Sequence, residues 1–268
     1  MPDQPLSKSL SRFFVLPSSI DMKAKRARIL DFQQIKQISN VLRQSVGSQV
    51  ILLDGKGLVL RCSISQIAKK EILLDILDEL PAIAEPSVQV TVAMPLLRGG
   101  RFDWALQKLT ELGVFAIQPV ICERSVVKDK NEKTDRWRSI AREAAEQCER
   151  SRVPEIGSPI GFADLVAPSA VNQWSMKVIC AERSKTILLS HALLNLQKCK
   201  NDERISDAWP MNILVIVGPE GGFTDEEIAN ADRMGFQLVS LGPRILRSET
   251  ASVYALAQVM TITSSDEN

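Results

Sequence analysis

The chain has 268 residues, of which 45% are hydrophobic and 24% are charged, and its formal net charge at pH 7 is +1. This composition is typical of a soluble globular protein with one large domain or two modest ones. No apolar run approaches the roughly 20 residues that cross a bilayer, and the N-terminal segment MPDQPLSKSLSRFF lacks the apolar core of a secretory signal. We therefore expect a cytoplasmic protein without a membrane partner.

The five cysteines and the single histidine argue against several kinds of site. No two cysteines have the CxxC spacing of a zinc site, and their odd number argues against a disulfide framework. The one histidine, His191, lies in the pattern LLSHALLNL, where we interpret it as an ordinary helix residue. We expect no bound metal and no catalysis by a Cys–His or Ser–His pair.

Residues 1–84 have the pattern of a β-domain. Two β-rich runs, QVILL and LVLRCSISQI, are joined by Asp54-Gly55-Lys56-Gly57, and Asp-Gly between apolar runs is a strong hairpin signal. A third run, EILLDILDEL, predicts another strand, and QQIKQISNVLR predicts a short helix. The segment PAIAEP, residues 81–86, is typical of a linker. These signals predict a small barrel or sheet.

After residue 84, strands and helices alternate, which predicts an α/β domain with a mainly parallel sheet covered on both faces. The predicted strands span residues 87–96, 114–122, 176–182, 212–218 and 236–242. The predicted helices span residues 101–113, 133–150, 185–198, 224–235 and 248–262. In open sheets of this kind, ligands bind beyond the carboxyl ends of the strands. We therefore expect the chemistry in the loops that begin near residues 179, 217 and 241.

The second of these loops has the sequence GPEGGFTDEEI. Thr224 and Glu227 form a T-x-x-E capping box, so a helix begins directly after the glycines. The loop has neither the G-x-G-x-x-G pattern nor the Gly-Lys-Ser/Thr of a phosphate-binding loop. Because Glu220 would repel phosphate, the turn suits a ligand with hydroxyls, an amine or a positive charge. A tight corner with a surface glutamate is the alternative.

The third loop, LGPRILRSETAS, carries more charge than a connecting loop usually does. Arg244, Arg247, Glu249 and Thr250 place two cations, an anion and a hydroxyl within seven residues. This density predicts a binding pocket at the end of the preceding strand.

The pair GPEGGFTDEEI and LGPRILRSETA resembles the signature of the RsmE family, bacterial 16S ribosomal RNA (uridine-N3) methyltransferases of the SPOUT superfamily. RGGRFDWALQKLTELGV, ERSVVK and EAAEQCERSRVPEI resemble the family too, so the likeness extends over both halves of the chain. The resemblance implies a PUA-like β-barrel that binds RNA over residues 1–84, and an α/β methyltransferase domain with a trefoil knot over residues 85–268. It also implies a homodimer, S-adenosylmethionine as cofactor, and 16S ribosomal RNA or the small ribosomal subunit as substrate.

Matched positions imply particular site residues. The cofactor is assigned to Cys180, Ala181 and Glu182 in the first loop, to Gly218, Glu220, Gly221 and Gly222 in the second, and to Leu241, Gly242, Arg244, Ile245, Leu246 and Arg247 in the third. RNA contacts are assigned to Arg12, Arg43, Arg101, Arg124, Lys128, Arg150 and Arg152. Where the family often has a histidine, this chain has Gln37, so a matching imidazole contact is lost.

Methylation of uracil at N3 requires that nitrogen to lose its proton, and the resulting negative charge spreads over O2 and O4. A guanidinium suits that charge because it is always protonated and fork-shaped. We predict this catalytic role for Arg247, with Arg244 as the substitute. Glu249 is predicted to orient an arginine or to accept the proton.

Two other functions stay open at this point. One is a knotted methyltransferase that modifies another RNA, such as transfer RNA or 23S ribosomal RNA. The other is a non-catalytic RNA-binding assembly protein that keeps the fold, although the intact GPEGG and RILRSET motifs favour a catalyst. A nucleotide-phosphate enzyme is disfavoured because the glycine turn has no lysine.

Overall fold

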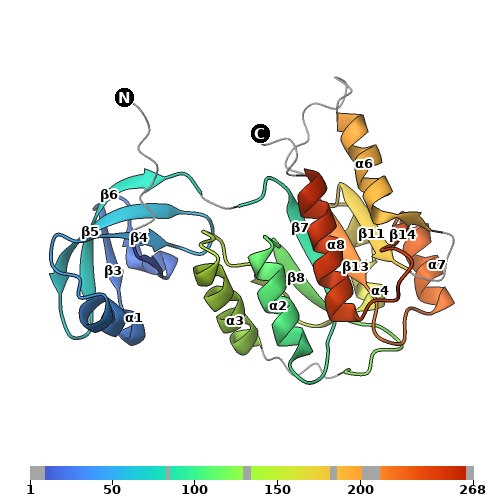
Figure 1. Ribbon diagram of the computed structural model, residues 1–268, viewed down its shortest axis with the longest axis horizontal. Helices are drawn as coiled ribbons and strands as arrows, with labels where there is room; N and C mark the ends of the chain where they lie inside the picture. Colours follow the sequence, from blue (N-terminus) through green and yellow to red (C-terminus); the bar gives the residue numbers. More distant parts are fainter. Residues whose placement is uncertain (1–9, 83–84, 129–133, 182–185, 201–211, 264–268) are drawn as a thin grey trace. The chain divides into compact units, whose positions relative to one another are not determined.

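The computed structural model describes residues 10–82, 85–128, 134–181, 186–200 and 212–263 (Figure 1). The chain forms two compact units, one made of residues 1–85 with 145–153 and the other of residues 86–144 with 154–268. The sequence places one boundary between residues 84 and 85, and it does not anticipate that the later segment 145–153 belongs with the first unit.

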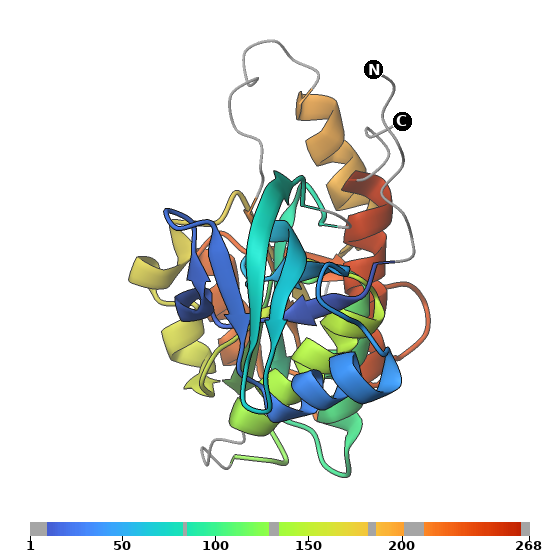
Figure 2. The ribbon, with the colours of Figure 1, turned by 90° about the vertical axis from the view of Figure 1, so that its left-hand side faces the viewer.

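The first unit is built on a six-stranded sheet with the order β1-β4-β5-β6-β3-β2 (Figures 1 and 2). Among its described pairs, β1 with β4 is parallel and the others are antiparallel. The strands are β1 (Arg12–Phe14), β2 (Ile20–Asp21), β3 (Arg26–Ile29), β4 (Gln49–Leu53), β5 (Val59–Ile67) and β6 (Ile72–Leu80). The helical segments are η1 (Pro17–Ser19), α1 (Phe32–Lys36) and η2 (Gln37–Val41).

The predicted hairpin at Asp54-Gly55 is confirmed, because it connects the antiparallel strands β4 and β5. Gly55 has a φ of +74°, which glycine adopts without strain. The Asp54 carboxylate accepts hydrogen bonds from the backbone N–H groups of Lys56 (2.7 Å) and Leu58 (3.0 Å). The predicted strand at β6 and the helix at residues 33–43 are also present. Strands β1, β2 and β3, with 3, 2 and 4 residues, were not predicted because they are too short to show an alternating pattern.

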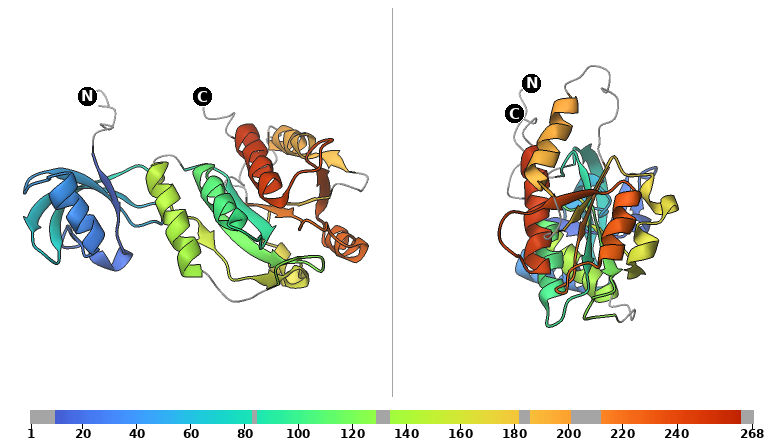
Figure 3. Two further views of the ribbon diagram at one scale, coloured as in Figure 1. Left: turned by 60° about the horizontal axis from the view of Figure 1, so that its bottom comes forward. Right: turned by 90° about the vertical axis from the view of Figure 1, so that its right-hand side faces the viewer.

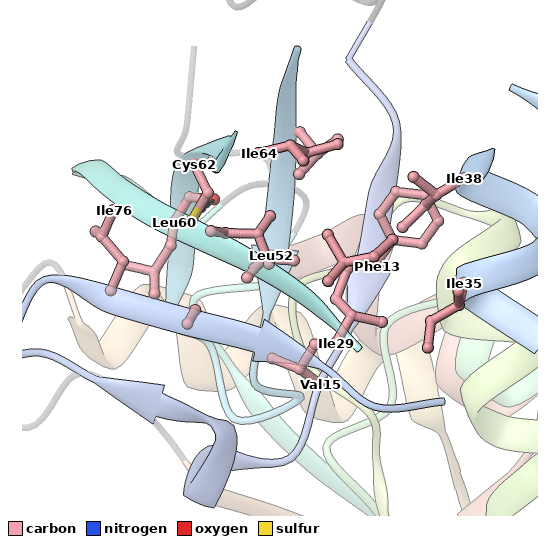
Figure 4. Close-up of a cluster of buried hydrophobic side chains, with 14 residues drawn as sticks. Phe13, Val15, Ile29, Ile35, Ile38, Leu52, Leu60, Cys62, Ile64 and Ile76 are labelled. Atoms are coloured by element: carbon pink, nitrogen blue, oxygen red, sulfur yellow. Dashed lines mark hydrogen bonds between the residues drawn. The ribbon is translucent and has the colours of Figure 1, made fainter. Parts of the chain in front are cut away.

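Alternate strand residues and the short helix form one buried core in the first unit (Figure 4). Leu52 of β4 and Leu60 of β5 pack with Ile35 of α1 and Ile38 of η2, and all four side chains are at most 5% exposed. Asp31 caps α1 by accepting hydrogen bonds from two backbone N–H groups of its first turn. The cap fixes where α1 begins, and α1 and the following η2 each present one isoleucine to the sheet.

A buried ion pair ties residues 145–153 to the first unit. Nη2 of Arg150 lies 2.8 Å from Oε2 of Glu85, and the Arg150 side chain is 2% exposed. The same carboxylate accepts hydrogen bonds from Ser151 Oγ (3.3 Å) and from the backbone N–H of Arg152 (2.9 Å). Arg150 was expected to contact RNA, and the structure places its guanidinium against Glu85, enclosed within its own unit.

The second unit contains a sheet with the order β10-β8-β7-β13-β11-β14-β12, and β9 also pairs with β8. Every described pair in it is parallel, as the sequence predicts. The strands are β7 (Gln89–Pro95), β8 (Ala116–Ile121), β9 (Glu155–Ile156), β10 (Ile160–Gly161), β11 (Met176–Cys180), β12 (Ile187–Leu188), β13 (Asn212–Val217) and β14 (Gln237–Ser240). The helices are α2 (Arg101–Glu111), α3 (Thr134–Gln147), α4 (Phe162–Leu165), α5 (Pro168–Val171), α6 (Leu189–Lys200), α7 (Asp225–Arg233) and α8 (Ser248–Thr263).

Helices cover both faces of this sheet, with α8 on one side and α7 on the other (Figure 3). Helix α8 packs against α2, α6, β7 and β13. On the opposite face, Phe162 of α4 and Ala231 of α7 pack with Leu214 and Ile216 of β13. A strand covered on both faces has no polar side, which is why NILVIV is almost wholly apolar. No helix within the described ranges is long and apolar enough to cross a membrane.

The segment 185–198, predicted as one helix, begins as a strand. Ile187 and Leu188 form β12, which pairs with Val239 and Ser240 of β14, and helix α6 starts only at Leu189. An edge strand of two residues has no periodicity of its own, so the aliphatic run blends with the helical pattern that follows it.

We expect Arg150→Ala to lower the free energy of unfolding by about 2–4 kcal/mol, because the substitution leaves the Glu85 carboxylate without its charged partner. The control is Arg28→Ala, at an exposed position of β3, which should change stability by less than about 0.5 kcal/mol. Urea unfolding followed by circular dichroism measures both values. Equally small effects of the two substitutions would contradict a structural role for Arg150.

Candidate functional site

Three loops leave one edge of the second sheet side by side. Strands β11, β13 and β14 are neighbours, and Cys180 lies opposite both Val217 of β13 and Val239 of β14. Since the strands are parallel, the segments that follow them emerge at the same edge. The structure thus brings together the three loops that the sequence singled out. Cys180 and Ala181 of the first loop are buried, and Glu182 lies outside the described residues.

The glycine turn after β13 is shaped largely by its packing on a neighbouring loop. A Cβ on Gly221 would lie 2.9 Å from the Cβ of Arg124 and 3.2 Å from its carbonyl oxygen. The Arg124 guanidinium donates to the carbonyls of Gly221 (3.4 Å) and Phe223 (3.1 Å). Gly222 has a φ of +68°, and its N–H donates to the Pro219 carbonyl at 2.8 Å. Glycine at 221 is therefore required by the protein itself, and Arg124, expected to contact RNA, holds the turn.

The predicted capping box is confirmed at the start of α7. Thr224 Oγ1 accepts from the backbone N–H of Glu227 (3.1 Å), and Glu227 Oε2 accepts from the backbone N–H of Thr224 (2.9 Å). The other carboxylate oxygen of Glu227 accepts from the backbone N–H of Glu123 at 2.9 Å. Glu227 thus fixes both the end of the glycine turn and the loop that carries Arg124.

Arg101, the first residue of α2, connects the second and third loops. Its Nη2 lies 3.0 Å from Oε1 of Glu220, and its Nη1 lies 3.9 Å from Oε2 of Glu249. Its Nε donates to the Arg98 carbonyl at 3.1 Å, which orients the guanidinium. This residue was expected to contact RNA, and the structure places it between two carboxylates of the candidate site.

Glu249 presents an unsatisfied acceptor at this point. Its side chain is 10% exposed, and its Oε2 is buried without a hydrogen-bond partner among the described residues. Burying a carboxylate oxygen that accepts no hydrogen bond is costly. The positive charge that lies nearest to this oxygen among the described ion pairs is the Arg101 guanidinium, at 3.9 Å.

The third loop is anchored at both of its ends. Ser240 Oγ accepts from the Gly242 N–H at 3.1 Å, and Gly242 has a φ of +117°. At the other end, Ser248 Oγ donates to the Gly218 carbonyl at 2.7 Å, which ties the start of α8 to the glycine turn. Between these anchors, Arg244 and Arg247 are exposed and form no ion pair within the described part of the chain. Both guanidinium groups therefore face solvent with respect to the described residues.

The remaining basic residues with a predicted RNA contact belong to both units. Arg12 pairs with Glu149 in the first unit, Nη1 to Oε2 at 3.0 Å, and its side chain is 19% exposed. The backbone of Arg152 is held by Glu85. Arg43 in the first unit and Lys128 in the second are exposed. RNA contacts by all seven basic residues stay predictions.

Two contributions to the site were missed by sequence reasoning. The bridging role of Arg101 depends on β7 lying beside β13, which only the strand order reveals. The bond from Ser248 to Gly218 joins residues thirty positions apart. The sequence RGGR directly after a predicted strand was the one available signal, because glycines at a strand end often mark a ligand site.

Comparison with known proteins identifies the family. The family model described as RNA methyltransferase domain matches residues 84–260, and the model described as RNA methyltransferase PUA domain matches residues 38–77. The ribosomal RNA small subunit methyltransferase E of Synechocystis is 36% identical over 226 residues, which cover 84% of this chain and 70% of the relative. The chain belongs to this methyltransferase family. The Bacillus subtilis member is 29% identical and covers 93% of this chain and 96% of its own length.

Solved structures of the family resemble this methyltransferase over nearly its whole length. The small subunit methyltransferase E of Neisseria gonorrhoeae, bound to S-adenosylmethionine, is 30% identical with a TM-score of 0.74, and the match covers 94% of this chain and 98% of that one. A Legionella pneumophila methyltransferase in complex with S-adenosylmethionine is 28% identical with a TM-score of 0.72, covering 94% and 97%. The predicted PUA and α/β methyltransferase folds are confirmed. The trefoil knot stays a prediction, since residues 182–185 of the first loop are not described.

Cys122, directly before the loop that carries Arg124, should resist alkylation in the folded protein. Burial raises the pKa of its thiol to about 12 from 9.0, and the negative charge of Glu227 adds to the shift. In the unfolded chain the Cys122 thiol ionises near pH 9. The contribution that the neutral, buried thiol makes to the stability of the folded state is therefore complete below pH 9 and is lost as the pH rises toward 12. We expect little reaction with iodoacetamide at pH 8, measured by mass spectrometry of tryptic peptides.

Cys148, which is half-buried, is the internal control for that labelling and should react faster. Alkylation of Cys122 as fast as that of Cys148 in the native protein would contradict the buried position.

Proposed function

We propose that this protein transfers a methyl group from S-adenosylmethionine to N3 of one uridine in the 16S ribosomal RNA of the small ribosomal subunit. The observation that carries the proposal is the buried Glu249 carboxylate oxygen without a hydrogen-bond donor, beside Arg101 and Glu220 at the convergence of the three loops. The names of the relatives and the ligand of two similar solved structures support the same reaction.

The residues at this edge fit S-adenosylmethionine. Glu220 and Glu249 supply negative charge for a ligand that carries an amine and a sulfonium. At Gly222 and Gly242, no atom of the described residues lies within 4 Å of the position a Cβ would take, so a ligand can reach the backbone. The cofactor, when bound, supplies an electrophilic methyl group. The proposed surroundings are completed by Cys180, Ala181, Gly218, Gly221, Leu241, Arg244, Ile245, Leu246 and Arg247.

The third loop and the first turn of α8 supply the proposed catalytic groups. The carboxylate of Glu249, which lies beside Arg101, orients that guanidinium or accepts the proton that uracil N3 must lose. The negative charge then spreads over O2 and O4 of the base. Arg247, exposed two residues earlier, stabilises that charge, and Arg244 supplies a second guanidinium. Arg101 keeps Glu249 next to the glycine turn.

We also propose a homodimer that acts in the cytoplasm, where ribosomal RNA is found. Trp104 on α2 and Tyr254 on α8 are 45% and 42% exposed, and these two helices pack on each other. Exposed aromatic side chains on adjoining helices are typical of a surface that a partner covers.

Replacing Arg247 tests the catalytic assignment. We expect Arg247→Ala to lower kcat by about 100-fold or more, because a guanidinium that meets charge only in the transition state acts on kcat. Calorimetric titration should show that the Kd for S-adenosylmethionine rises by less, at most about tenfold, because the other residues of the three loops still hold the cofactor. Arg233→Ala, at an exposed arginine of α7, is the matched control. Near-normal turnover of Arg247→Ala would remove the catalytic role.

The substrate is tested by mass spectrometry of ribosomal RNA from cells with and without the gene. We expect N3-methyluridine to be missing from one 16S fragment when the gene is absent, and to return when the unsubstituted gene is supplied. Loss of a methyl group from 23S or transfer RNA instead would show that the enzyme acts on that RNA and not on 16S ribosomal RNA. Unchanged RNA together with no binding of S-adenosylmethionine would favour a non-catalytic RNA-binding protein.

A further inference from the structure

A cleft of about 440 Å³ opens in the second unit at the carboxyl end of β7. Its walls come from the segment after β7, from the start of α2, from Val127 after β8, and from α3. The volume lies within the range of about 300–1,000 Å³ that is usual for small-molecule sites. No residue assigned to the cofactor lines this cleft.

The position of the cleft relates it to the proposed methyl-transfer site. Strand β7 pairs in parallel with β13, so the carboxyl end of β7 adjoins the glycine turn. Gly100 and Phe102 line the cleft, and Arg101 between them reaches Glu220 and Glu249. Residues 100–102 therefore contribute both to the wall of the cleft and to the ion pairs with Glu220 and Glu249.

The loop after β8 connects the same two places. Arg124 of this loop bonds the glycine turn, and Val127, three residues later, lines the cleft. A molecule held in the cleft would thus lie next to the edge where the three cofactor loops converge.

The walls of the cleft combine an apolar surface with a charged rim. Leu97, Phe102 and Trp137 line it, and the two aromatic rings pack with their centroids 4.8 Å apart. The rim carries the exposed Arg98 and the ion pair between Arg136 and Asp103. A planar ring with a polar edge, attached to phosphates, matches this combination, because apolar walls contact its faces while guanidinium groups bind oxygens.

Two glycines leave part of the wall without side chains. Gly99 and Gly100 have φ angles of +66° and +78°, and no atom of the described residues lies within 4 Å of where a Cβ on either would be. Both residues line the cleft, so its occupant can approach the backbone directly.

We propose that this cleft receives the uracil base of the RNA after the base leaves its stack. The proposal rests on the proposed function, since methylation at N3 requires the base to be unstacked. Arg98 and Arg136 contact the flanking phosphates, and the apolar walls hold the ring on the side of the cleft from which Arg101 reaches Glu249.

Filling the cleft tests the proposal. We expect Val127→Trp to raise the KM for small-subunit RNA by about tenfold or more and to leave the Kd for S-adenosylmethionine within about twofold. Val126→Trp is the matched control, because Val126 is 50% exposed and does not line the cleft. It should change neither value.

Arg98→Glu is a second variant, chosen because it should fold normally. The Arg98 side chain is exposed, and the backbone carbonyl of residue 98, which accepts a hydrogen bond from Arg101, is unchanged by the substitution. This variant should also raise the KM for RNA, whereas Arg138→Glu, on α3 and outside the cleft, should not do so to the same extent. If the unsubstituted enzyme is active and neither Val127→Trp nor Arg98→Glu changes the KM for RNA, the proposal that the cleft receives uracil is wrong, while the proposed function stands. An unsubstituted protein that neither binds S-adenosylmethionine nor methylates RNA would overturn the proposed function as well.

Discussion

The contact of one guanidinium with two carboxylates organises the candidate site. Arg101 stands at the beginning of α2, Glu220 in the turn after β13, and Glu249 in the first turn of α8. Without this cation, two acidic groups from different loops would repel each other at the edge of the sheet. With it, the carboxylates stay close enough to serve one ligand, and one oxygen of Glu249 remains without a donor. The position of Arg101 thus depends on how α2 packs on α8, and the arrangement of the two carboxylates depends on Arg101.

Several arginines of this chain serve the fold, although their clustering in the sequence is typical of an RNA-binding surface. Arg150 is enclosed with Glu85 and ties a late segment to the first unit. Arg124 bonds the carbonyls of the glycine turn. Arg244 and Arg247, near the convergence of the loops, face solvent and form no ion pair within the described residues. Pairing, rather than the number of cations, separates the two groups: Arg150 is buried with a carboxylate, and Arg124, although exposed, is hydrogen-bonded to two backbone carbonyls.

Much of the second unit was predictable because its strands and helices are long and periodic. The capping box of Thr224 and Glu227 and the parallel sheet follow from local patterns that tertiary structure left unchanged. The three loops were identified because ligands of parallel sheets gather at strand ends. What the sequence missed depends on strand order and on distant pairing: the place of Arg101 beside Glu220, the bond from Ser248 to Gly218, and the two-residue strand β12. The cofactor and the RNA came from the family resemblance, since the residues alone indicated only a pocket that disfavours phosphate.

Hydrogen–deuterium exchange of the full chain with and without S-adenosylmethionine tests the central claim most directly, because it locates the ligand without any substitution. The account predicts that the cofactor slows amide exchange in peptides covering residues 217–224 and 240–250, and in the peptide that contains Arg101. Slower exchange confined to the first unit, or to residues 155–171 on the α4 side of the second, would contradict it.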